Sequence, residues 1–307
     1  MAANNKMSYS KLDTYKQCGW RYFLQYVEGP YISTPGIALD VGTMIHDAEE
    51  QIANAIKDGK PIDYISLKNK IILNTLTIEH KFPKDFWEPD KTGKLYKEKI
   101  YSYLDKGIYR LEAYMKAHPE LEIVGAEIPF KFELYGYNFS GKIDRLLRDN
   151  NTGNYICQDI KTYPQPADDK DIVTPLQFVI YTMAIKQMYN VTDEQVSCGY
   201  DLPFCDMIQS AGTTGYVARG LKKIEKLITD INNKDYTAKP SPLCAWCTYS
   251  KTNPNQPKDP NAHNRCPYHS LWTKEKHNFN VANEWMGMEN HKAILEHYIK
   301  TSSEDAV

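Results

Sequence analysis

The chain has 307 residues, of which 42% are hydrophobic and 25% charged, and its formal net charge is −2. This composition fits a globular protein with one large domain or two small ones and excludes fibrous and disordered classes. No apolar run approaches the ~20 residues of a membrane-spanning helix, and the opening "MAANNKMSYS" lacks a signal-peptide stretch. We therefore expect a soluble, cytoplasmic protein with no membrane association, in which any nucleic-acid site is a local basic patch.

The first part of the chain has apolar residues at helical spacing. The predicted helices cover residues 8–28, 40–58, 62–80 and 96–117. Serine at position 8 or 10 can cap the first of them. Two prolines and a glycine in residues 81–95 indicate a loop.

The period then changes from 3.6 to 2, which predicts strands. Three strands over residues 122–134, 137–147 and 154–161 are separated by the turns "YG" and "DNNTG", so they form an antiparallel meander. The remaining predicted elements are a helix over 170–189, a strand over 195–203 and a helix over 217–233. This order predicts an α/β fold with a mixed central sheet and an N-terminal helical layer.

Two of the predicted strands carry acids in apolar surroundings. Asp144 and Asp159 lie on adjacent strands, and Lys161 follows on the same face as Asp159. Converging carboxylates repel each other unless a cation lies between them, and Mg²⁺ or Mn²⁺ prefers oxygen ligands. The pattern therefore favours a cation site with a lysine beside it. The alternative is that Asp144–Arg145 and Asp159–Lys161 are surface ion pairs of an edge hairpin.

The seven cysteines are odd in number and come without a secretory signal, which indicates metal binding or buried thiols rather than disulfides. We interpret Cys157, Cys198 and Cys205, which lie in apolar strand-like runs, as core residues. The sequence "CAWC" at 244–247 is a strong metal-binding signal, and "CPYH" further on could complete a zinc site. That zinc site would consist of Cys244, Cys247, Cys266 and His269.

Basic and aromatic residues alternate in residues 81–110, a combination that suits single-stranded nucleic acid. The candidate DNA-binding residues are Trp87, Lys94 and Lys97, with Lys222 and Lys223 as a second patch. The alternative for both is an amphipathic helix with a solvated lysine face.

Four motifs together resemble the PD-(D/E)XK nuclease superfamily. The pattern "GKIDRL…YICQDIKT" is similar to its motifs II and III. "SYSKLDTYKQCGWRYFLQYVEG", "VGTMIHDAEE" and "LQFVIYTMAI" are similar to motifs of its RecB-like exonuclease branch, and the matches span about residues 7 to 270. That branch includes CRISPR-adaptation nucleases and phage-borne exonucleases, some with an iron–sulfur cluster.

The resemblance implies a restriction-endonuclease-like core and a set of site residues. In that reading Mg²⁺ or Mn²⁺ is held by His46, Asp144, Asp159 and the backbone carbonyl of Ile160, with Glu127 as a further acid. Lys161 positions the attacking water, and Gln177 and Tyr181 lie near the scissile phosphate.

The resemblance also implies a [4Fe–4S] cluster, because some RecB-like proteins join an N-terminal cysteine to three C-terminal ones. The corresponding residues are Cys18, Cys244, Cys247 and Cys266. The 18 residues between Cys247 and Cys266 are more than the family usually has. Zn²⁺ therefore stays open as the alternative metal.

We expect a single RecB-like domain over residues 1–275 and a partly helical tail over 276–307. Its expected parts are a helical insertion at about 58–118, a catalytic core at about 120–235 and a cysteine segment at 240–270 that packs on the N-terminal helix. The expected function is a metal-dependent DNA exonuclease that acts on single strands or DNA ends in recombination, repair or replication, alone or with other proteins of those processes. The alternatives are a DNA-binding or assembly subunit that cleaves little, and a zinc-stabilised interaction protein.

Overall fold

The computed structural model describes residues 5–28, 36–89, 93–163, 175–205, 207–211, 215–239, 241, 243–244, 247–249 and 266. The chain divides into two compact units, and each is described by itself. The first comprises residues 1–9 and 36–223, and the second comprises residues 10–35 and 224–307. The predicted tail, the start of the predicted helix 170–189 and His269 lie outside the described residues.

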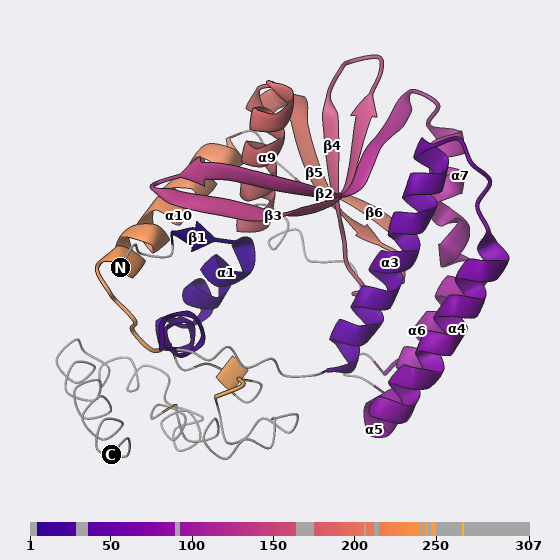
Figure 1. The fold of residues 1–307 in the computed structure, drawn as a ribbon, viewed down its shortest axis with the longest axis horizontal. Helices are drawn as coiled ribbons and strands as arrows, with labels where there is room; N and C mark the ends of the chain where they lie inside the picture. Colours follow the sequence, from indigo (N-terminus) through magenta and orange to yellow (C-terminus); the bar gives the residue numbers. More distant parts are fainter. Residues whose placement is uncertain are drawn as a thin grey trace. The chain divides into compact units, whose positions relative to one another are not determined.

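A mixed β-sheet forms the centre of the first unit (Figure 1). Within the described residues the sheet has six strands in the order β1-β3-β4-β5-β6, with β2 also paired to β3. The strands are β1 (Lys6–Met7), β2 (Leu121–Leu134), β3 (Tyr137–Asp149), β4 (Tyr155–Ile160), β5 (Val196–Leu202) and β6 (Met207–Ala211). β1 runs parallel to β3, β4 runs parallel to β5, and the other pairs are antiparallel. The predicted mixed α/β class is confirmed, and β1 and β6 were not predicted.

The meander of β2, β3 and β4 forms because its turn residues accept left-handed backbone angles. Tyr135 and Gly136 have φ angles of 51° and 76°, which a two-residue hairpin turn requires. In the second turn Gly153 has a φ of 74°. There Asp149 accepts hydrogen bonds from the backbone N–H groups of Asn151 and Thr152.

The helices of the first unit agree with the predicted ones except at two places. They are α3 (Ile37–Lys57), α4 (Tyr64–Lys81), α5 (Pro83–Trp87), α6 (Tyr96–Asp105), the 3₁₀ turn η2 (Gly107–Tyr109), α7 (Arg110–Ala117), α9 (Leu176–Tyr189), the 3₁₀ turn η3 (Asp193–Gln195) and α10 (Tyr216–Asn232), which continues into the second unit. The loop prediction for 81–95 was wrong at α5, because Pro83 occupies the first turn of a helix, where proline is tolerated. The single helix predicted over 96–117 is interrupted at Gly107, which lies against the backbone of Pro203.

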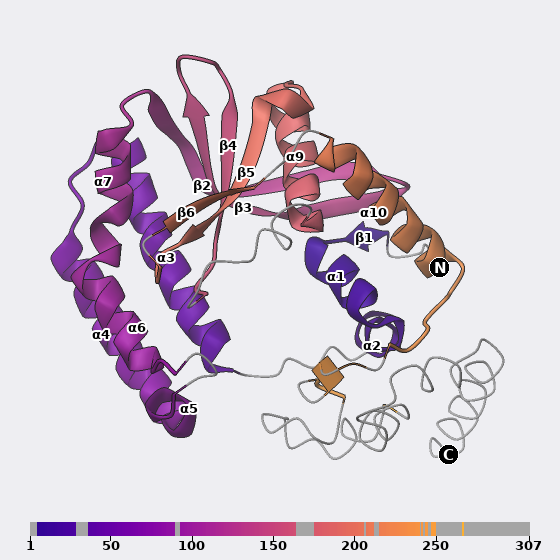
Figure 2. The same cartoon turned by 180° about the vertical axis from the view of Figure 1, so that it is seen from behind.

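Helices α3 and α9 cover different parts of the sheet. α3 packs mainly on β2 and β3, whereas α9 packs mainly on β5. Figures 1 and 2 show the two helices on the two sides of the strands β4 and β5. The stripe Val41, Ile45, Ala48 and Ile52 is fully buried at helical spacing, so α3 is held on the sheet by its apolar face.

The second unit contains the N-terminal helices, apart from their first residue. The predicted helix 8–28 is divided into α1 (Tyr9–Gln17), α2 (Gly19–Tyr22) and a π-helical turn η1 (Phe23–Glu28). The interruption falls at Cys18, whose backbone is extended. Gly19 follows, and a Cβ atom there would lie 2.9 Å from the carbonyl oxygen of Thr237. This close approach requires glycine and brings Cys18 beside residues of the C-terminal segment.

Candidate active site

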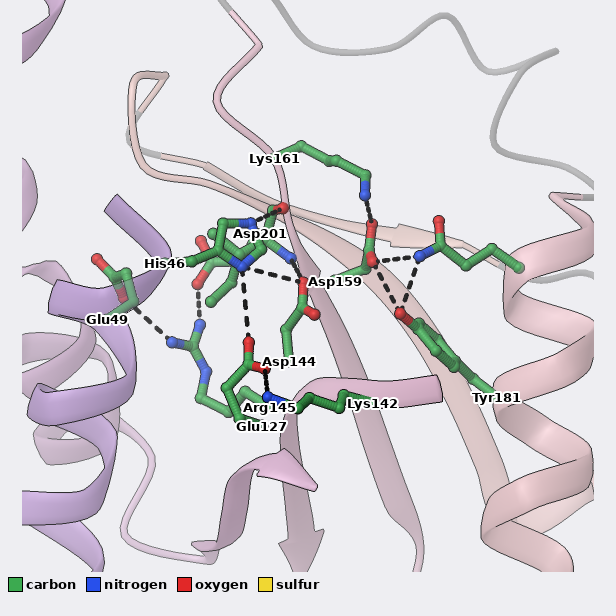
Figure 3. A network of polar contacts seen from close by, with 12 residues as sticks. His46, Glu49, Glu127, Lys142, Asp144, Arg145, Asp159, Lys161, Tyr181 and Asp201 are labelled. Atoms are coloured by element: carbon green, nitrogen blue, oxygen red, sulfur yellow. Dashed lines mark hydrogen bonds and ion pairs between the residues drawn. The ribbon is translucent and has the colours of Figure 1, made fainter. Parts of the chain in front are cut away.

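Three potential metal ligands converge where α3 meets β2 and β3 (Figure 3). One ligand atom each from His46, Glu127 and Asp144 lies within 4.8 Å of the others. His46 Nδ1 is 3.7 Å from Asp144 Oδ2 and 3.8 Å from Glu127 Oε1. All three residues are half-buried. Two carboxylates and an imidazole are a ligand set for a divalent cation such as Mg²⁺ or Mn²⁺.

The hydrogen bond of His46 Nε2 favours the tautomer in which Nδ1 is free to bind a metal. His46 Nε2 lies 2.9 Å from the carbonyl oxygen of Ile160. A carbonyl can only accept, so Nε2 carries the proton and the lone pair of the neutral ring is on Nδ1, which faces the two acids. Metal-bound histidines donate their other N–H to a backbone carbonyl in the same way.

Glu127 reaches this position because its backbone leaves the regular strand conformation. The β2–β3 register pairs Ala126 with Arg145 and Ile128 with Ile143, and between them Glu127 has a φ of 50°. Non-glycine residues rarely adopt this region, and such strain is concentrated at functional sites. Lys142 Nζ contacts the other carboxylate oxygen at 3.2 Å. Sequence reasoning did not single out Lys142, because a solvent-facing lysine in a strand gives no signal.

Asp159 lies apart from the three-ligand cluster and has its own set of donors. Lys161 Nζ is 2.7 Å from Asp159 Oδ2. The amide of Gln177 donates to Oδ1 at 2.8 Å, and the hydroxyl of Tyr181 donates to the same oxygen at 3.2 Å. Gln177 also donates to the Tyr181 hydroxyl at 2.8 Å. The two α9 residues singled out in the sequence therefore hold the acid of the D-x-K motif, as Figure 3 shows for Tyr181.

Electrostatic coupling links the cluster to Asp159. Burial, and secondarily repulsion from Asp159, raises the pKa of Asp144 from its ordinary 3.8 to about 6. Burial lowers the pKa of Lys161, but attraction to Asp159 and the hydrogen bond between them outweigh it, so the pKa stays above its ordinary value and the ammonium is charged. A carboxylate whose ionisation is opposed by burial and by a second carboxylate is an arrangement that a divalent cation relieves.

The expected ligand set and the observed one overlap without being identical. His46, Glu127 and Asp144 meet at one place, whereas the carbonyl of Ile160 accepts a hydrogen bond from the other ring nitrogen of His46, Nε2. The backbone N–H of Ile160 donates to Asp144 Oδ2 at 2.8 Å. Asp159 faces Lys161 and α9, so its entry into a shared metal shell requires a change of its present partners.

A buried charge network lies next to the site. Arg145 follows Asp144 in β3 and is fully buried, so the alternative of a surface ion pair was wrong for this residue. Its guanidinium contacts Glu49 of α3 and Asp201 of β5, and Asp201 also pairs with Arg110. Sequence reasoning missed these residues because arginine and acids are ordinarily exposed.

All four cysteines proposed for a cluster line one pocket of the second unit. Cys18, Cys247 and Cys266 pack against a small core of Trp20, Leu24, Ala238 and Tyr249. The backbone N–H of Lys239 donates to Cys18 Sγ and that of Ser241 to Cys244 Sγ, both at 3.4 Å. Such N–H···S contacts are typical of sulfurs that serve as metal ligands.

The other three cysteines belong to the first unit. Cys157 and Cys198 are buried, as predicted, and are register partners on β4 and β5. Cys205 lies in the turn after β5 and is only half-buried, so its assignment to the core was wrong.

Four of the five candidate DNA-binding residues are exposed, and Lys97 is half-buried. Trp87 ends α5 and is 51% exposed, and Lys97 of α6 lies over its ring at 4.1 Å. Lys94 is exposed just before α6, and Lys222 and Lys223 are exposed on α10. The ion pairs of the acidic cluster given for the described residues join His46, Glu127, Asp144 and Lys142.

The family model of the PD-(D/E)XK nuclease superfamily matches residues 6–252. The match covers more than half of the chain, so the chain belongs to this superfamily of nucleases. The expected restriction-endonuclease-like core is thereby confirmed, with its central mixed sheet flanked by helices.

Individual proteins that are similar to this chain include a curated relative and a solved structure. One is a subunit of an ATP-dependent helicase/deoxyribonuclease from Carboxydothermus hydrogenoformans, which is 28% identical in an alignment 169 residues long that covers 49% of this chain and 15% of the relative. The chain thus spans only a small part of that protein's length. The solved structure "Crystal structure of SSO0001" is 16% identical over 61% of this chain and 84% of the other, with a TM-score of 0.27. Among the described residues, none of the helices has the length and apolar character needed to cross a bilayer.

Proposed function

We propose that this member of the nuclease superfamily is a metal-dependent DNA exonuclease that hydrolyses phosphodiester bonds of single strands or DNA ends. The observation that carries the proposal is the cluster of His46, Glu127 and Asp144 beside the Asp159–Lys161 pair. A structural ion pair between Asp159 and Lys161 needs neither a third acid nor an imidazole whose Nδ1 faces two carboxylates. The relative named as part of a helicase/deoxyribonuclease supports DNA as the substrate.

In this mechanism each residue has a distinct role. His46 Nδ1, Asp144 and Glu127 bind Mg²⁺ or Mn²⁺, and Asp159 joins them when substrate displaces its present partners. The bound cation would lower the pKa of a water ligand and stabilise charge on the phosphate. Lys161 holds the attacking water in line and balances the phosphate charge through its ammonium. Before substrate binds, Gln177 and Tyr181 hold the Asp159 carboxylate beside Lys161.

For the second unit we propose a [4Fe–4S] cluster held by Cys18, Cys244, Cys247 and Cys266. Four thiolates are the usual complement of such a cluster, and the four residues share one pocket. The zinc alternative replaces Cys18 by His269. Iron analysis and absorbance of the purified protein near about 400 nm distinguish the two metals.

The proposed partners are DNA and, in the cytoplasm, other proteins of recombination, repair or replication. Support comes from the name of the relative, which describes one subunit of a larger helicase-containing enzyme. Co-purification of the tagged chain from its native host, with and without nuclease treatment, separates protein partners from those bridged by DNA.

The test of the proposed activity uses end-labelled linear DNA, single- and double-stranded, beside covalently closed circles. Wild type with Mn²⁺ is expected to shorten linear DNA from its ends and leave circles intact, and Asp159→Ala is expected to be inactive. Asp105→Ala, which removes an exposed acid at the end of α6, is the matched control and is expected to retain activity. Cleavage of circles contradicts the exonuclease assignment, and wild-type activity of Asp159→Ala contradicts the mechanism.

A further inference from the structure

The metal-site histidine and a buried glutamate lie on the same face of α3. His46 and Glu49 are three residues apart, so their side chains are neighbours on the helix surface. Their partners are consecutive in β3. His46 faces Asp144, and Glu49 Oε2 lies 3.1 Å from Nη1 of Arg145. The same helix and the same strand are therefore joined twice, once at the candidate metal site and once in the protein interior (Figure 3).

The interior connection is fully shielded from solvent and closely bonded. Both Glu49 and Arg145 have side chains with 0% exposure. Tyr103 donates its hydroxyl proton to the other oxygen of Glu49 at 2.9 Å, so the carboxylate has a defined rotation. Arg145 Nε donates to Gln158 at 2.7 Å, which ties the guanidinium to the strand of Asp159.

The remaining charges balance the pair. Arg145 Nη2 contacts Asp201 of β5, and Asp201 also pairs with Arg110 of α7. Two carboxylates and two guanidiniums thus neutralise one another in the interior. Residues next to both site acids take part, since Arg145 follows Asp144 and Gln158 precedes Asp159.

Stability alone does not account for such a network. Buried ion pairs are often no more stabilising than apolar side chains of similar volume, and their best-attested use is to specify geometry. The apolar stripe of α3 is non-directional, and it permits small shifts of the helix along the sheet. A guanidinium paired with a carboxylate is directional, so it defines one position of the helix.

We propose that Glu49 and Arg145 are positioning residues that fix α3 on β3 so that His46 Nδ1 faces Asp144. The proposal rests on the metal site of the proposed function and adds two residues that do not touch the metal. Loss of the pair is expected to weaken metal binding, because the distance between the His46 imidazole and the two carboxylates is then no longer fixed. Outer residues that orient metal ligands typically contribute about 10- to 100-fold to affinity.

The test measures Mn²⁺ binding to the full chain by calorimetry and the Mn²⁺ spectrum by electron paramagnetic resonance. Glu49→Gln keeps the side-chain shape but removes the charge that faces Arg145. Asp201→Asn is the matched control, because it removes the other carboxylate of the same guanidinium without touching α3. Both variants are expected to lower the urea midpoint of unfolding by similar amounts. Only Glu49→Gln is expected to weaken Mn²⁺ binding, by about tenfold.

The outcomes separate the two proposals. If Glu49→Gln and Asp201→Asn bind Mn²⁺ with equal affinity, the positioning role is wrong. If wild type does not bind Mn²⁺, or if Asp144→Asn binds it as well as wild type does, the metal site itself is wrong. Should Glu49→Gln not fold, Tyr103→Phe removes only the hydrogen bond that orients Glu49. A smaller weakening by that variant supports the positioning role, and an unchanged affinity overturns it.

Discussion

Asp144→Asn is expected to stabilise the metal-free protein while abolishing metal binding. The Asp144 side chain is only 12% exposed, and its pKa is raised from 3.8 to about 6, mainly by burial. One pKa unit corresponds to about 1.4 kcal/mol, so ionised Asp144 costs the folded state about 3 kcal/mol relative to the unfolded chain. Asparagine has no charge to desolvate, and its side-chain oxygen can still accept the N–H of Ile160.

The pH dependence of this effect has a definite sign. Below the unfolded pKa of 3.8 the carboxyl is neutral in both states, so wild type and variant differ little. Between 3.8 and about 6 only the unfolded chain ionises, and wild type progressively loses stability relative to the variant. Above about 6 the difference is constant and at its largest.

The assay is urea unfolding followed by fluorescence and circular dichroism, with protein freed of Mg²⁺ and Mn²⁺ by gel filtration. At about pH 8 the variant is expected to gain up to about 3 kcal/mol of unfolding free energy. Asp105→Asn, an exposed acid, serves as the control with no gain expected. A variant less stable than wild type, or a gain that persists unchanged at about pH 4, would refute the reasoning.

The remaining predictions concern catalysis and metal content. Lys161→Ala is expected to lower kcat by about 10²- to 10³-fold with Mn²⁺ affinity maintained, because its ammonium contacts Asp159 and not the ligand cluster; calorimetry that shows lost binding would contradict this. Tyr181→Phe removes one of two α9 donors to Asp159 and is expected to reduce kcat by about tenfold, whereas an unchanged kcat would show that Gln177 suffices. Mn²⁺ affinity is expected to fall as the pH drops through about 6, since protonated Asp144 does not bind a cation; a flat profile over this range would exclude Asp144 as a ligand. Cys18→Ser is expected to lower the iron content measured by elemental analysis, and Cys205→Ser, which lies outside the cysteine pocket, is expected to leave it unchanged.

The parts of the fold that follow from local periodicity were predictable. The alternating strands 122–134 and 137–147 and the helix 40–58 correspond closely to β2, β3 and α3. Their spacing is a direct consequence of one buried face. The interruption at Cys18 was not predictable, because it depends on the approach of Thr237 to Gly19 from the far end of the chain.

The candidate site divides in the same way. The sequence motifs singled out His46, Asp144 and Asp159. The structure showed that Asp144 lies beside His46 and that Asp159 accepts a hydrogen bond from Gln177. Glu127 reaches the site through a positive φ angle, which its residue type does not predict. The burial of Arg145 was missed because its partners Glu49 and Asp201 are far away in sequence, and only the tertiary fold brings them together.

The hydrogen bond from the Ile160 amide to Asp144 makes a side chain part of the sheet. The last pair of the β3–β4 ladder is Arg145 with Gln158, and beyond it the carboxylate of Asp144 takes the place of a strand carbonyl. Alanine at position 144 would therefore leave a shielded amide without an acceptor as well as remove a charge. Asp144→Ala would therefore combine loss of the metal ligand with loss of a hydrogen bond at the end of the β3–β4 ladder. Asp144→Asn removes the charge and keeps the acceptor, so it separates the two effects.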